Sequence, residues 1–382
     1  MNKLGSYISR PHSILTGKTN LEPLFVFRDL PIFMGCTDTP YRDDVVADMD
    51  WGICPQSGCI QLRRLVPLDS VYLNQHNDGV WKIWQDLYAK FVAFLLRFAH
   101  GARILEIGGA HDVIARNYLQ HRPEAQWTIV EPNPQHIRNS EVHIVPAWFD
   151  GDFRLSMDTD TVVHSHVLEH TYEPQTFLKD LATYLKPGRR HIFAVPNLQP
   201  MLENKFTNCL NFEHNVFLTE HFIDWLLARS GFKILAKEYY ATPHSILYAT
   251  ERIAEPKSQA PLESRYSEYK KLFREFVRYH EEMIVQLNAK LDTAKVPVYL
   301  FGAHIFSIYL INFGLHAEKI ISVLDNSSLK QSRRLYGTQF IVESSKVLAG
   351  KGPVNVIVRA GIYNEEIKND IHENINREVT FW

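Results

Sequence analysis

Two acidic residues and a pair of adjacent glycines are spaced as in a nucleoside-binding site. The run LEIGG contains Glu106 and ends in Gly108 and Gly109, and the run IVEPN places Glu131 25 residues after Glu106. Glycines let the backbone approach a ligand closely, and an acid at the end of a second strand binds both hydroxyls of a ribose. These residues therefore predict a cofactor that contains a nucleoside.

The turn after the glycines does not suit a phosphate. Dinucleotide sites prefer the pattern G-x-G-x-x-G, with the pyrophosphate at a helix N-terminus, but here Asp112 stands where the phosphate would lie. S-adenosylmethionine (SAM) has a ribose and an ammonium group but no phosphate, and its binding requires a carboxylate at the position of Glu106. We therefore expect Glu106, Gly108, Gly109 and Glu131 to bind SAM. A strand–turn–helix that binds no ligand is the alternative.

Alternating strand and helix patterns must position these residues. An amphipathic helix is predicted over 78–100, and β-rich runs then alternate with helical segments up to residue 250. Two of the helical segments stop at a glycine, as helices commonly do. The alternation predicts a doubly wound, Rossmann-like α/β domain. A second unit of this kind begins after Pro297, with Asp325 at the end of its second strand.

The overall composition excludes several kinds of partner. The chain has 382 residues, with 41 basic and 43 acidic side chains and a net charge of −2. No global field would attract such a protein to nucleic acid or to an anionic membrane. The N-terminal residues lack a secretory signal, no run is apolar enough to span a membrane, and 4 cysteines are too few for a disulfide scaffold. We therefore expect a cytoplasmic protein of two or more domains.

The motifs of the central region resemble those of class I SAM-dependent methyltransferases. The runs LEIGGAH, IVEPN, VVHSHVLEHTYEP, LKPG and AVPN occur in this order between residues 78 and 250. The whole chain resembles the three-module sugar C-methyltransferases, in which a small zinc-binding module precedes the methyltransferase domain and a Rossmann-like domain follows it. The resemblance implies a substrate that is a nucleotide-linked keto sugar. We divide the chain into an N-terminal module (1–75), a methyltransferase domain (76–250), a helical connector (251–296) and a Rossmann-like C-terminal domain (297–382).

The resemblance implies further cofactor contacts. It assigns them to Trp148 and Phe149, which follow the third strand, and to His166, which follows the fourth. An aromatic ring after the third strand can stack on adenine. A place for Trp148 and Phe149 in the hydrophobic core is an equal alternative.

The catalytic signature of the resembled family is Tyr-x-Glu-His, and this chain has Asn211, Phe212, Glu213 and His214 in its place. The resemblance makes His214 the general base, which takes a proton either from carbon next to a keto group or from a hydroxyl. It also places Glu213 and Asn211 in the catalytic site, and His170 at the wall of the pocket.

Departures from the family weaken the case for carbon methylation. Asn211 replaces the tyrosine of the signature, and Ala194 and Asn197 replace a glutamate and a tyrosine around the proline of AVPN. An enolate formed on a keto sugar needs a nearby hydrogen-bond donor, which Asn211 imitates only in part. Methylation of a sugar hydroxyl is therefore one alternative, and a non-catalytic binding or scaffold protein is another.

No metal cofactor is expected at the active site. The sulfonium of SAM is already a good leaving group, so the protein has mainly to align the reactants and remove a proton. His164, His166 and His170 lie within seven residues of one another. Ligation of a divalent cation by these three histidines is the alternative.

The N-terminal module resembles a zinc knuckle that has lost its ligands. The run CPQSGCIQL keeps Cys54 but has Ser57 at the second ligand position, and the first ligand pair aligns with Ser13 and Thr16. Hydroxyls of serine and threonine do not replace thiolates at structural zinc. We therefore predict no zinc here, and a site rebuilt from other cysteines and a histidine is the alternative.

The C-terminal domain has two alternative roles. Its FGAHIFS turn has Phe306 and Ser307 where a phosphate-binding turn of the family would have Lys and Gly. The domain either binds the nucleotide end of the substrate, or it has a structural role and forms a homodimer. The resemblance also implies that Tyr72 and Asn74 of the N-terminal module contact the acceptor.

Overall fold

The protein divides into two compact units in the computed structural model, which describes residues 1–71, 82–109, 111–134, 141–255 and 260–382. The first unit consists of Met1–Asn77, Met201–Phe212 and Arg265–Trp382, and the second of Asp78–Pro200 and Glu213–Ser264. Tyr72, Asn74 and the predicted boundary after residue 75 lie outside the described residues. Within those ranges, no helix is long and apolar enough to cross a bilayer.

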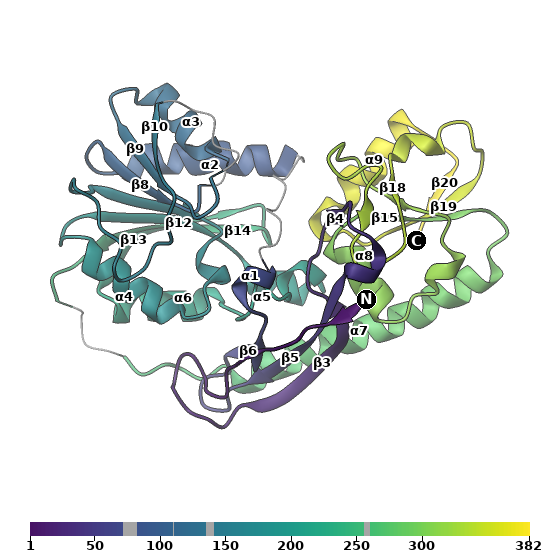
Figure 1. Ribbon diagram of the computed structural model, residues 1–382, viewed down its shortest axis with the longest axis horizontal. Coiled ribbons are helices and arrows are strands. Elements are labelled where there is room, and N and C mark those ends of the chain that lie inside the picture. The colour runs from purple at the N-terminus through teal and green to yellow at the C-terminus, as the bar shows by residue number, and fades with distance from the viewer. Residues whose placement is uncertain (72–81, 110, 135–140, 256–259) are drawn as a thin grey trace. The chain divides into compact units, whose positions relative to one another are not determined.

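The second unit is built on one seven-stranded sheet. From edge to edge its strands are β10 (Val142–Val145), β9 (Gln126–Val130), β8 (Arg103–Ile107), β11 (Thr161–Ser165), β12 (Arg190–Pro196), β14 (Ser245–Arg252) and β13 (Phe232–Tyr240). The helices of this unit are α2 (Lys82–Phe98), α3 (Val113–His121), η2 (Leu168–His170), α4 (Pro174–Tyr184), α6 (Glu220–Arg229) and the start of α5 (Leu198–Glu203). The strands from β10 to β12 are parallel, and β14 is antiparallel to both of its neighbours. Figure 1 shows α2 and α3 on one face of the sheet and α4 and α6 on the other. The predicted doubly wound fold is therefore confirmed.

The helices of this unit follow the patterns read from the sequence. Leu87, Phe91 and Phe94 are buried at spacings of four and three residues, so that α2 presents one apolar face to the core. Gly231, whose φ is 81°, directly follows Ser230, the C-cap of α6, as predicted, whereas α4 ends at Tyr184 with Leu185 as its C-cap and Gly188, whose φ is 83°, lies in the turn that follows. A left-handed glycine at the end of a helix turns the chain without a steric cost from a side chain.

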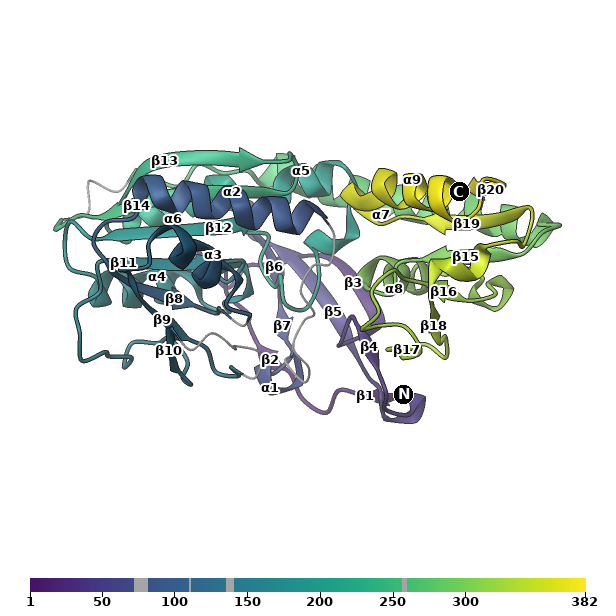
Figure 2. The same ribbon diagram turned by 90° about the horizontal axis from the view of Figure 1, so that it is seen from above.

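Residues 1–71 contain two long strands, which the sequence analysis did not predict. β3 (Glu22–Pro31) and β5 (Val45–Ile53) are antiparallel partners and lie side by side in Figure 2. Their register shifts twice along β3. Such irregularities interrupt the alternation of apolar and polar residues, which explains why the sequence lacks the pattern of a regular strand. The other elements of this module are β1 (Asn2–Lys3), β2 (Ile8–Ser9), β4 (Cys36–Thr37), η1 (Tyr41–Asp43), β6 (Ile60–Leu62), β7 (Arg64–Leu65) and α1 (Leu68–Val71).

Two short turns of the N-terminal module, 13–18 and 54–59, have the same hydrogen-bond pattern. In each turn, the first residue donates its N–H to the carbonyl five positions later and accepts from the N–H four positions later, at 2.8–2.9 Å. The glycine at the fifth position has a positive φ in both turns, 70° at Gly17 and 80° at Gly58. The chain therefore forms two matching loops, as the resemblance to a zinc knuckle implies.

The four ligand positions of the knuckle converge on the one remaining thiol. Thr16 Oγ1 lies 3.5 Å from Cys54 Sγ, and the hydroxyls of Ser57 and Ser13 also form hydrogen bonds with this sulfur. Burial raises the pKa of the Cys54 thiol, but the hydroxyl contacts outweigh burial and bring the pKa below its usual value. Hydrogen bonds to sulfur thus connect the positions that a metal would otherwise hold together. All of the cysteines are free and buried.

The C-terminal part of the first unit contains the predicted second Rossmann-like fold. The connector helix α7 (Tyr266–Thr293) leads into a five-stranded parallel sheet. In spatial order its strands are β18 (Val342–Glu343), β16 (Val323–Leu324), β15 (Val298–Phe301), β19 (Val354–Val358) and β20 (Val379–Phe381). The remaining elements are η3 (Thr207–Cys209), α8 (Ile305–Asn312), η4 (Ala317–Lys319), β17 (Arg334–Leu335), η5 (Ser345–Leu348), η6 (Gly361–Tyr363) and α9 (Asn364–Asn374).

A buried ion pair joins the N-terminal and C-terminal parts of the first unit. Beside the antiparallel pair β4–β17, two guanidinium nitrogens of Arg334 each lie 2.6 Å from an oxygen of Asp44. Gly337 N donates to the same carboxylate at 2.7 Å, and Arg334 also donates to the carbonyls of Thr39 and Thr338 at 2.8 Å. Removal of either charged partner would leave an uncompensated buried charge, which typically costs about 3–5 kcal/mol.

The two matching turns predict that the knuckle keeps the backbone of a zinc site and lacks only the thiol ligands. We expect the purified protein to contain far less than one zinc per chain, because one thiol and three hydroxyls do not hold the ion. The triple variant Ser13→Cys, Thr16→Cys, Ser57→Cys should bind one zinc per chain, as measured by elemental analysis after dialysis. Ser6→Cys, Thr19→Cys, Ser70→Cys adds three thiols outside the knuckle and serves as the control. Stoichiometric zinc in the natural protein, or none in the triple variant, would contradict this account.

Candidate cofactor and active site

The two glycines after β8 allow close approaches that a side chain would prevent. Gly108 has a φ of 75°, and a Cβ atom added there would lie 2.8 Å from Val167 Cγ2. A Cβ atom at Gly109 would lie 2.7 Å from the carboxyl carbon of Glu106. The turn therefore fits between the loop after β11 on one side and the Glu106 carboxyl on the other. The positive φ favours glycine at position 108, and a side chain at position 109 would displace the Glu106 carboxyl.

Glu106 is held behind this turn by a tryptophan that the sequence analysis did not select. Trp127 Nε1 donates to Glu106 Oε2 at 2.8 Å, and only 3% of the Glu106 surface is exposed. Burial raises the pKa of the Glu106 carboxyl to about 7; the Trp127 hydrogen bond opposes this rise, and the charges of Asp112 and Glu131 add to it. Side chains alternate between the two faces of a strand, and Trp127 and Glu131 are an even number of residues apart near β9. This alternation was the signal from which the orientation of the Trp127 side chain could have been predicted.

Glu131 completes an acidic group at the carboxyl ends of the central strands. It is buried after β9 and accepts a hydrogen bond from Asn133 N at 3.0 Å, and burial raises the pKa of its carboxyl. Asp112, also buried, adopts a φ of 49° before the first turn of α3. The acids at 106, 112 and 131 are close enough to influence one another. This arrangement favours a ligand with positive charge and hydroxyl groups over one with phosphate.

The structure separates the two aromatic residues that follow β10. The Phe149 ring packs against Phe153 and Tyr184, with centroids 5.3 and 5.6 Å away, so it has the surroundings of a core residue. Trp148 is 57% exposed. Its ring is therefore available to a ligand, whereas the ring of Phe149 is already engaged with its neighbours.

His166, at the end of β11, lies in a chain of hydroxyl and imidazole groups. It has a φ of 55°, and its ring nitrogens lie 3.0 Å from Ser165 Oγ and 3.1 Å from Ser245 Oγ. The Trp84 ring of α2 packs edge-on against it at 5.2 Å. Burial lowers the pKa of His166 well below its usual value, and the nearby imidazoles of His170 and His214 contribute to this shift. His166 is thus neutral and close enough to these two histidines for their charges to affect it.

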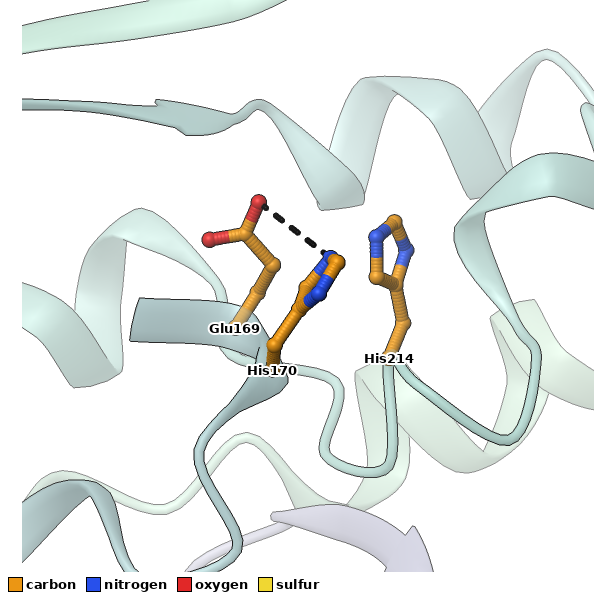
Figure 3. A group of neighbouring side chains, drawn as sticks. All are labelled: Glu169, His170 and His214. Carbon is orange, nitrogen blue, oxygen red and sulfur yellow. Dashed lines mark ion pairs between the residues drawn. The ribbon is translucent and has the colours of Figure 1, made fainter. Parts of the chain in front are cut away.

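Four side chains from two loops meet next to the glycine turn. η2, whose N-cap is Val167, carries Glu169 and His170, and the loop before α6 carries Glu213 and His214. His170 Nδ1 lies 3.6 Å from Glu213 Oε2, and the His170 and His214 rings are 5.1 Å apart. Figure 3 shows the Glu169, His170 and His214 side chains side by side, with the His170 ring between the other two groups.

Glu169 is the member of this cluster that the sequence analysis did not place in the site. Its side chain is 1% exposed, an oxygen lies 4.0 Å from His170 Nε2, and neither oxygen has a hydrogen-bond partner among the described residues. Burial raises the pKa of the Glu169 carboxyl to about 8, and the charge of Glu213 adds to the effect. The signal for this position was its place next to His170 in the run VVHSHVLEHTYEP, from which the sequence analysis selected only the histidines.

The alternative metal site made of His164, His166 and His170 does not form. His164 is fully buried in β11, where its Nε2 lies 2.9 Å from His191 Nε2 and its ring stacks on Phe193 at 4.9 Å. Burial lowers the pKa of His164 to about 3, so the ring stays neutral. His164 lies within β11 and belongs to the core, whereas His166 and His170 follow the strand, and the φ of 55° at His166 turns the chain out of the strand direction before the loop cluster.

Asn211 belongs to the first unit, whereas Glu213 and His214 belong to the second. The side-chain amide of Asn211 donates to Asn208 O at 3.3 Å. Ala194 is fully buried in β12, and Asn197 follows that strand.

Asp325 of the C-terminal domain is engaged by its own surroundings. Its oxygens accept hydrogen bonds from Ala303 N at 3.0 Å, from Ser327 N at 2.9 Å and from Lys330 Nζ at 3.1 Å. The Asp325 carboxylate is thus already engaged in holding the turn after β15. The corresponding acid of a nucleotide site would instead bind a ribose.

Comparison with known proteins places the second unit in a family context. A sequence family described as a methyltransferase domain matches residues 80–237. No curated protein matches the sequence significantly.

Solved structures with a related fold have low sequence identity to this chain. The mitomycin 7-O-methyltransferase MmcR is 17% identical, with 44% of this chain and 54% of that chain covered and a TM-score of 0.38. Burkholderia thailandensis 1,6-didemethyltoxoflavin-N1-methyltransferase, with bound 1,6-didemethyltoxoflavin and S-adenosylhomocysteine, is 16% identical, with coverages of 45% and 81% and a TM-score of 0.36. Human N-acetylserotonin methyltransferase in complex with SAM is 14% identical, with coverages of 45% and 53% and a TM-score of 0.39. The match thus spans about half the length of MmcR.

The family match and the sheet order of the second unit agree with each other. Strands β8, β9 and β11 bring the glycine turn, the acids and the histidine cluster to the side of the sheet where these strands end. All of these residues lie within the matched range, 80–237. The second unit of the chain therefore contains a methyltransferase domain.

Proposed function

We propose that this protein transfers the methyl group of SAM to a nucleotide-linked sugar, with carbon methylation of a keto sugar as the first candidate reaction. The observation that carries the proposal is the contact between the cofactor turn and the histidine cluster. Gly108 approaches Val167, and Val167 caps the short helix that carries His170. A cofactor on the glycine turn would thus lie beside the imidazoles of His170 and His214, where a proton must be removed from the acceptor.

The residues of the second unit have distinct roles in this proposal. Glu131 holds the ribose hydroxyls, and the negative charge of Glu106 and Asp112 attracts the cationic methionine part of the cofactor. The sulfonium of bound SAM supplies the electrophilic methyl group. His214 takes the proton from the acceptor, and Glu213 orients His170, 3.6 Å away, beside it. Alignment of acceptor and donor then provides most of the remaining rate enhancement.

Oxygen methylation is the second candidate, and one contact favours it. An enolate needs a donor to stabilise its oxygen, and the Asn211 amide, which replaces the family tyrosine, already donates to Asn208 O at 3.3 Å. A hydroxyl acceptor needs only the base. The engaged carboxylate of Asp325 likewise supports a structural role for the C-terminal domain over binding of the nucleotide.

The acceptor can be identified directly. Incubation of a panel of nucleotide sugars with SAM should yield a product heavier by one methyl group, as detected by mass spectrometry, for a keto sugar or for a sugar with a free hydroxyl. In deuterated water, a carbon methyltransferase should also exchange label into the carbon next to the keto group, because enolate formation is reversible. Methylation without exchange assigns the oxygen. Absence of any methylated sugar, together with S-adenosylhomocysteine affinity no tighter than millimolar, would support the scaffold alternative and overturn the proposal.

Cofactor affinity should depend on the ionisation of Glu106. Its pKa near 7 means that the carboxyl gains a proton as the pH falls below neutral, and it then no longer attracts the cationic ligand. Affinity for SAM, measured by calorimetry, should therefore be constant above about pH 8 and fall by up to about tenfold per pH unit below 7. Glu106→Gln should bind SAM weakly at all of these pH values and lose this dependence. An unchanged pH profile in Glu106→Gln would assign the titration to another group.

Replacement of the proposed base should affect the rate and spare the cofactor site. We expect His214→Asn to lower kcat by about 10²- to 10⁴-fold, the usual contribution of a positioned base, with affinity for S-adenosylhomocysteine unchanged. His221→Asn is the matched control, because the His221 ring contacts Glu263 O at 2.8 Å and is outside the cluster. Equal turnover in the two variants would remove His214 from this role.

A further inference from the structure

We infer that Glu169, His170 and His214 form a binding site for one divalent transition-metal ion such as Zn²⁺, and that the bound ion blocks methyl transfer. One ligand atom from each of the three side chains lies within 4.8 Å of the other two. Figure 3 shows the three groups next to one another, Glu169 and His170 on η2 and His214 on the loop before α6. This ligand set differs from the histidine trio suggested by sequence spacing.

The strongest observation is the state of the Glu169 carboxyl. Its side chain is 1% exposed, and neither oxygen has a hydrogen-bond partner among the described residues. A buried polar group without a partner costs about 1–3 kcal/mol, and more when it is charged, so native structures rarely keep one without a reason. A cation between Glu169 and the two imidazoles would give the carboxylate its missing partner.

The distances are those of a site that closes by small side-chain movements. Zinc binds imidazole nitrogen and carboxylate oxygen at about 2.0–2.2 Å, so neighbouring ligand atoms in a tetrahedral site lie about 3.3–3.6 Å apart. Glu169 Oε1 and His170 Nε2 are 4.0 Å apart, which rotation of the side chains can shorten. Two imidazoles and one carboxylate favour zinc or its neighbours in the periodic table over Mg²⁺ or Ca²⁺, which prefer oxygen ligands.

Glu213 has the place of an outer carboxylate in such a site. It lies 3.6 Å from Nδ1 of His170, on the side of the ring opposite the Nε2 atom that approaches Glu169. A carboxylate near Nδ1 favours the tautomer with a proton there, and the Nε2 lone pair is then directed at the metal. The chain therefore supplies three ligands, one of which is a histidine oriented by Glu213, and leaves a fourth coordination position for water or for a substrate oxygen.

Metal binding and proton transfer compete for the same atom, and this step rests on the proposed function. An imidazole that coordinates a cation through its lone pair has no lone pair left to accept a proton. Occupancy by zinc would therefore remove His214 as a base, while the glycine turn and the acids that bind SAM lie outside the ligand set. We expect inhibition that does not alter cofactor affinity.

Binding of the metal can be measured without methyl transfer. The full-length protein, treated with chelator, should bind one Co²⁺ per chain with the visible absorption of a four-coordinate site, and Zn²⁺ should displace it. Glu169→Gln keeps the shape of the side chain but removes the charge, and should weaken Co²⁺ binding at least tenfold. Glu173→Gln, which changes an exposed glutamate four residues away, should leave binding unchanged. Equal binding by the natural protein and Glu169→Gln, or no absorption change with Co²⁺ in excess, would overturn the site.

A separate assay tests the inhibition. Zn²⁺ should abolish methyl transfer over the concentration range in which it displaces Co²⁺, a chelator should restore the rate, and calorimetry should show the same affinity for S-adenosylhomocysteine with and without zinc. Methyl transfer that is unchanged or increased by bound zinc would overturn the inhibitory role. If the protein binds Co²⁺ through Glu169 but methylates no acceptor in the absence of metal, the proposed function fails and the metal site stands.

Discussion

The hydrogen bond from Trp127 to the buried Glu106 carboxyl fixes the geometry on which the methyltransferase site depends. It holds the carboxyl directly behind Gly109, where a Cβ atom would lie 2.7 Å from the carboxyl carbon. On the other side of the turn, Gly108 approaches Val167, the residue before the helix that carries His170. The glycine turn therefore packs closely against the loop that carries His170, because Gly108 has no side chain to keep the turn and Val167 apart. A larger residue at either glycine would shift one loop relative to the other.

The site combines groups whose charges the fold has suppressed. Burial keeps His166 neutral and holds the carboxyls of Glu106 and Glu169 largely or partly protonated near pH 7. A positively charged ligand reverses this at Glu106, because it compensates the negative charge that burial disfavours. The same reasoning applies to the loop cluster, in which Glu169 lacks a partner and two imidazoles stand close by. The proposed function and the inferred metal site would thus give this part of the second unit affinity for cations of two kinds, an organic sulfonium at the glycine turn and a metal ion at the histidines.

The sequence was sufficient for the features that depend on local pattern and insufficient for those that depend on distant contacts. The order of strands and helices in the second unit and the glycines at helix ends follow from periodicity and turn chemistry, as does the α7 connector. The long strands β3 and β5 were missed because their register shifts break the alternation that identifies a strand. The histidines of HSHVLEH looked equivalent, but strand geometry sends His164 into the core against His191 and leaves His170 in the loop. Partners such as His214, 44 residues from His170 along the chain, or Trp127 for Glu106, become visible only when the sheet is assembled.

The order in which the chain emerges during synthesis follows from the β4–β17 pair and its ion pair. Asp44 meets Arg334, 290 residues later, and at roughly 5–20 residues per second a ribosome needs about 15–60 seconds to make the intervening chain. The second unit, which is encoded between these residues apart from its short break at 201–212, has all of its strands available by residue 252. The amino-terminal strands therefore wait as a nascent segment while the methyltransferase sheet forms. A polypeptide released before Arg334 lacks the guanidinium that pairs with Asp44, so incomplete products would differ from the finished protein in the first part to be made.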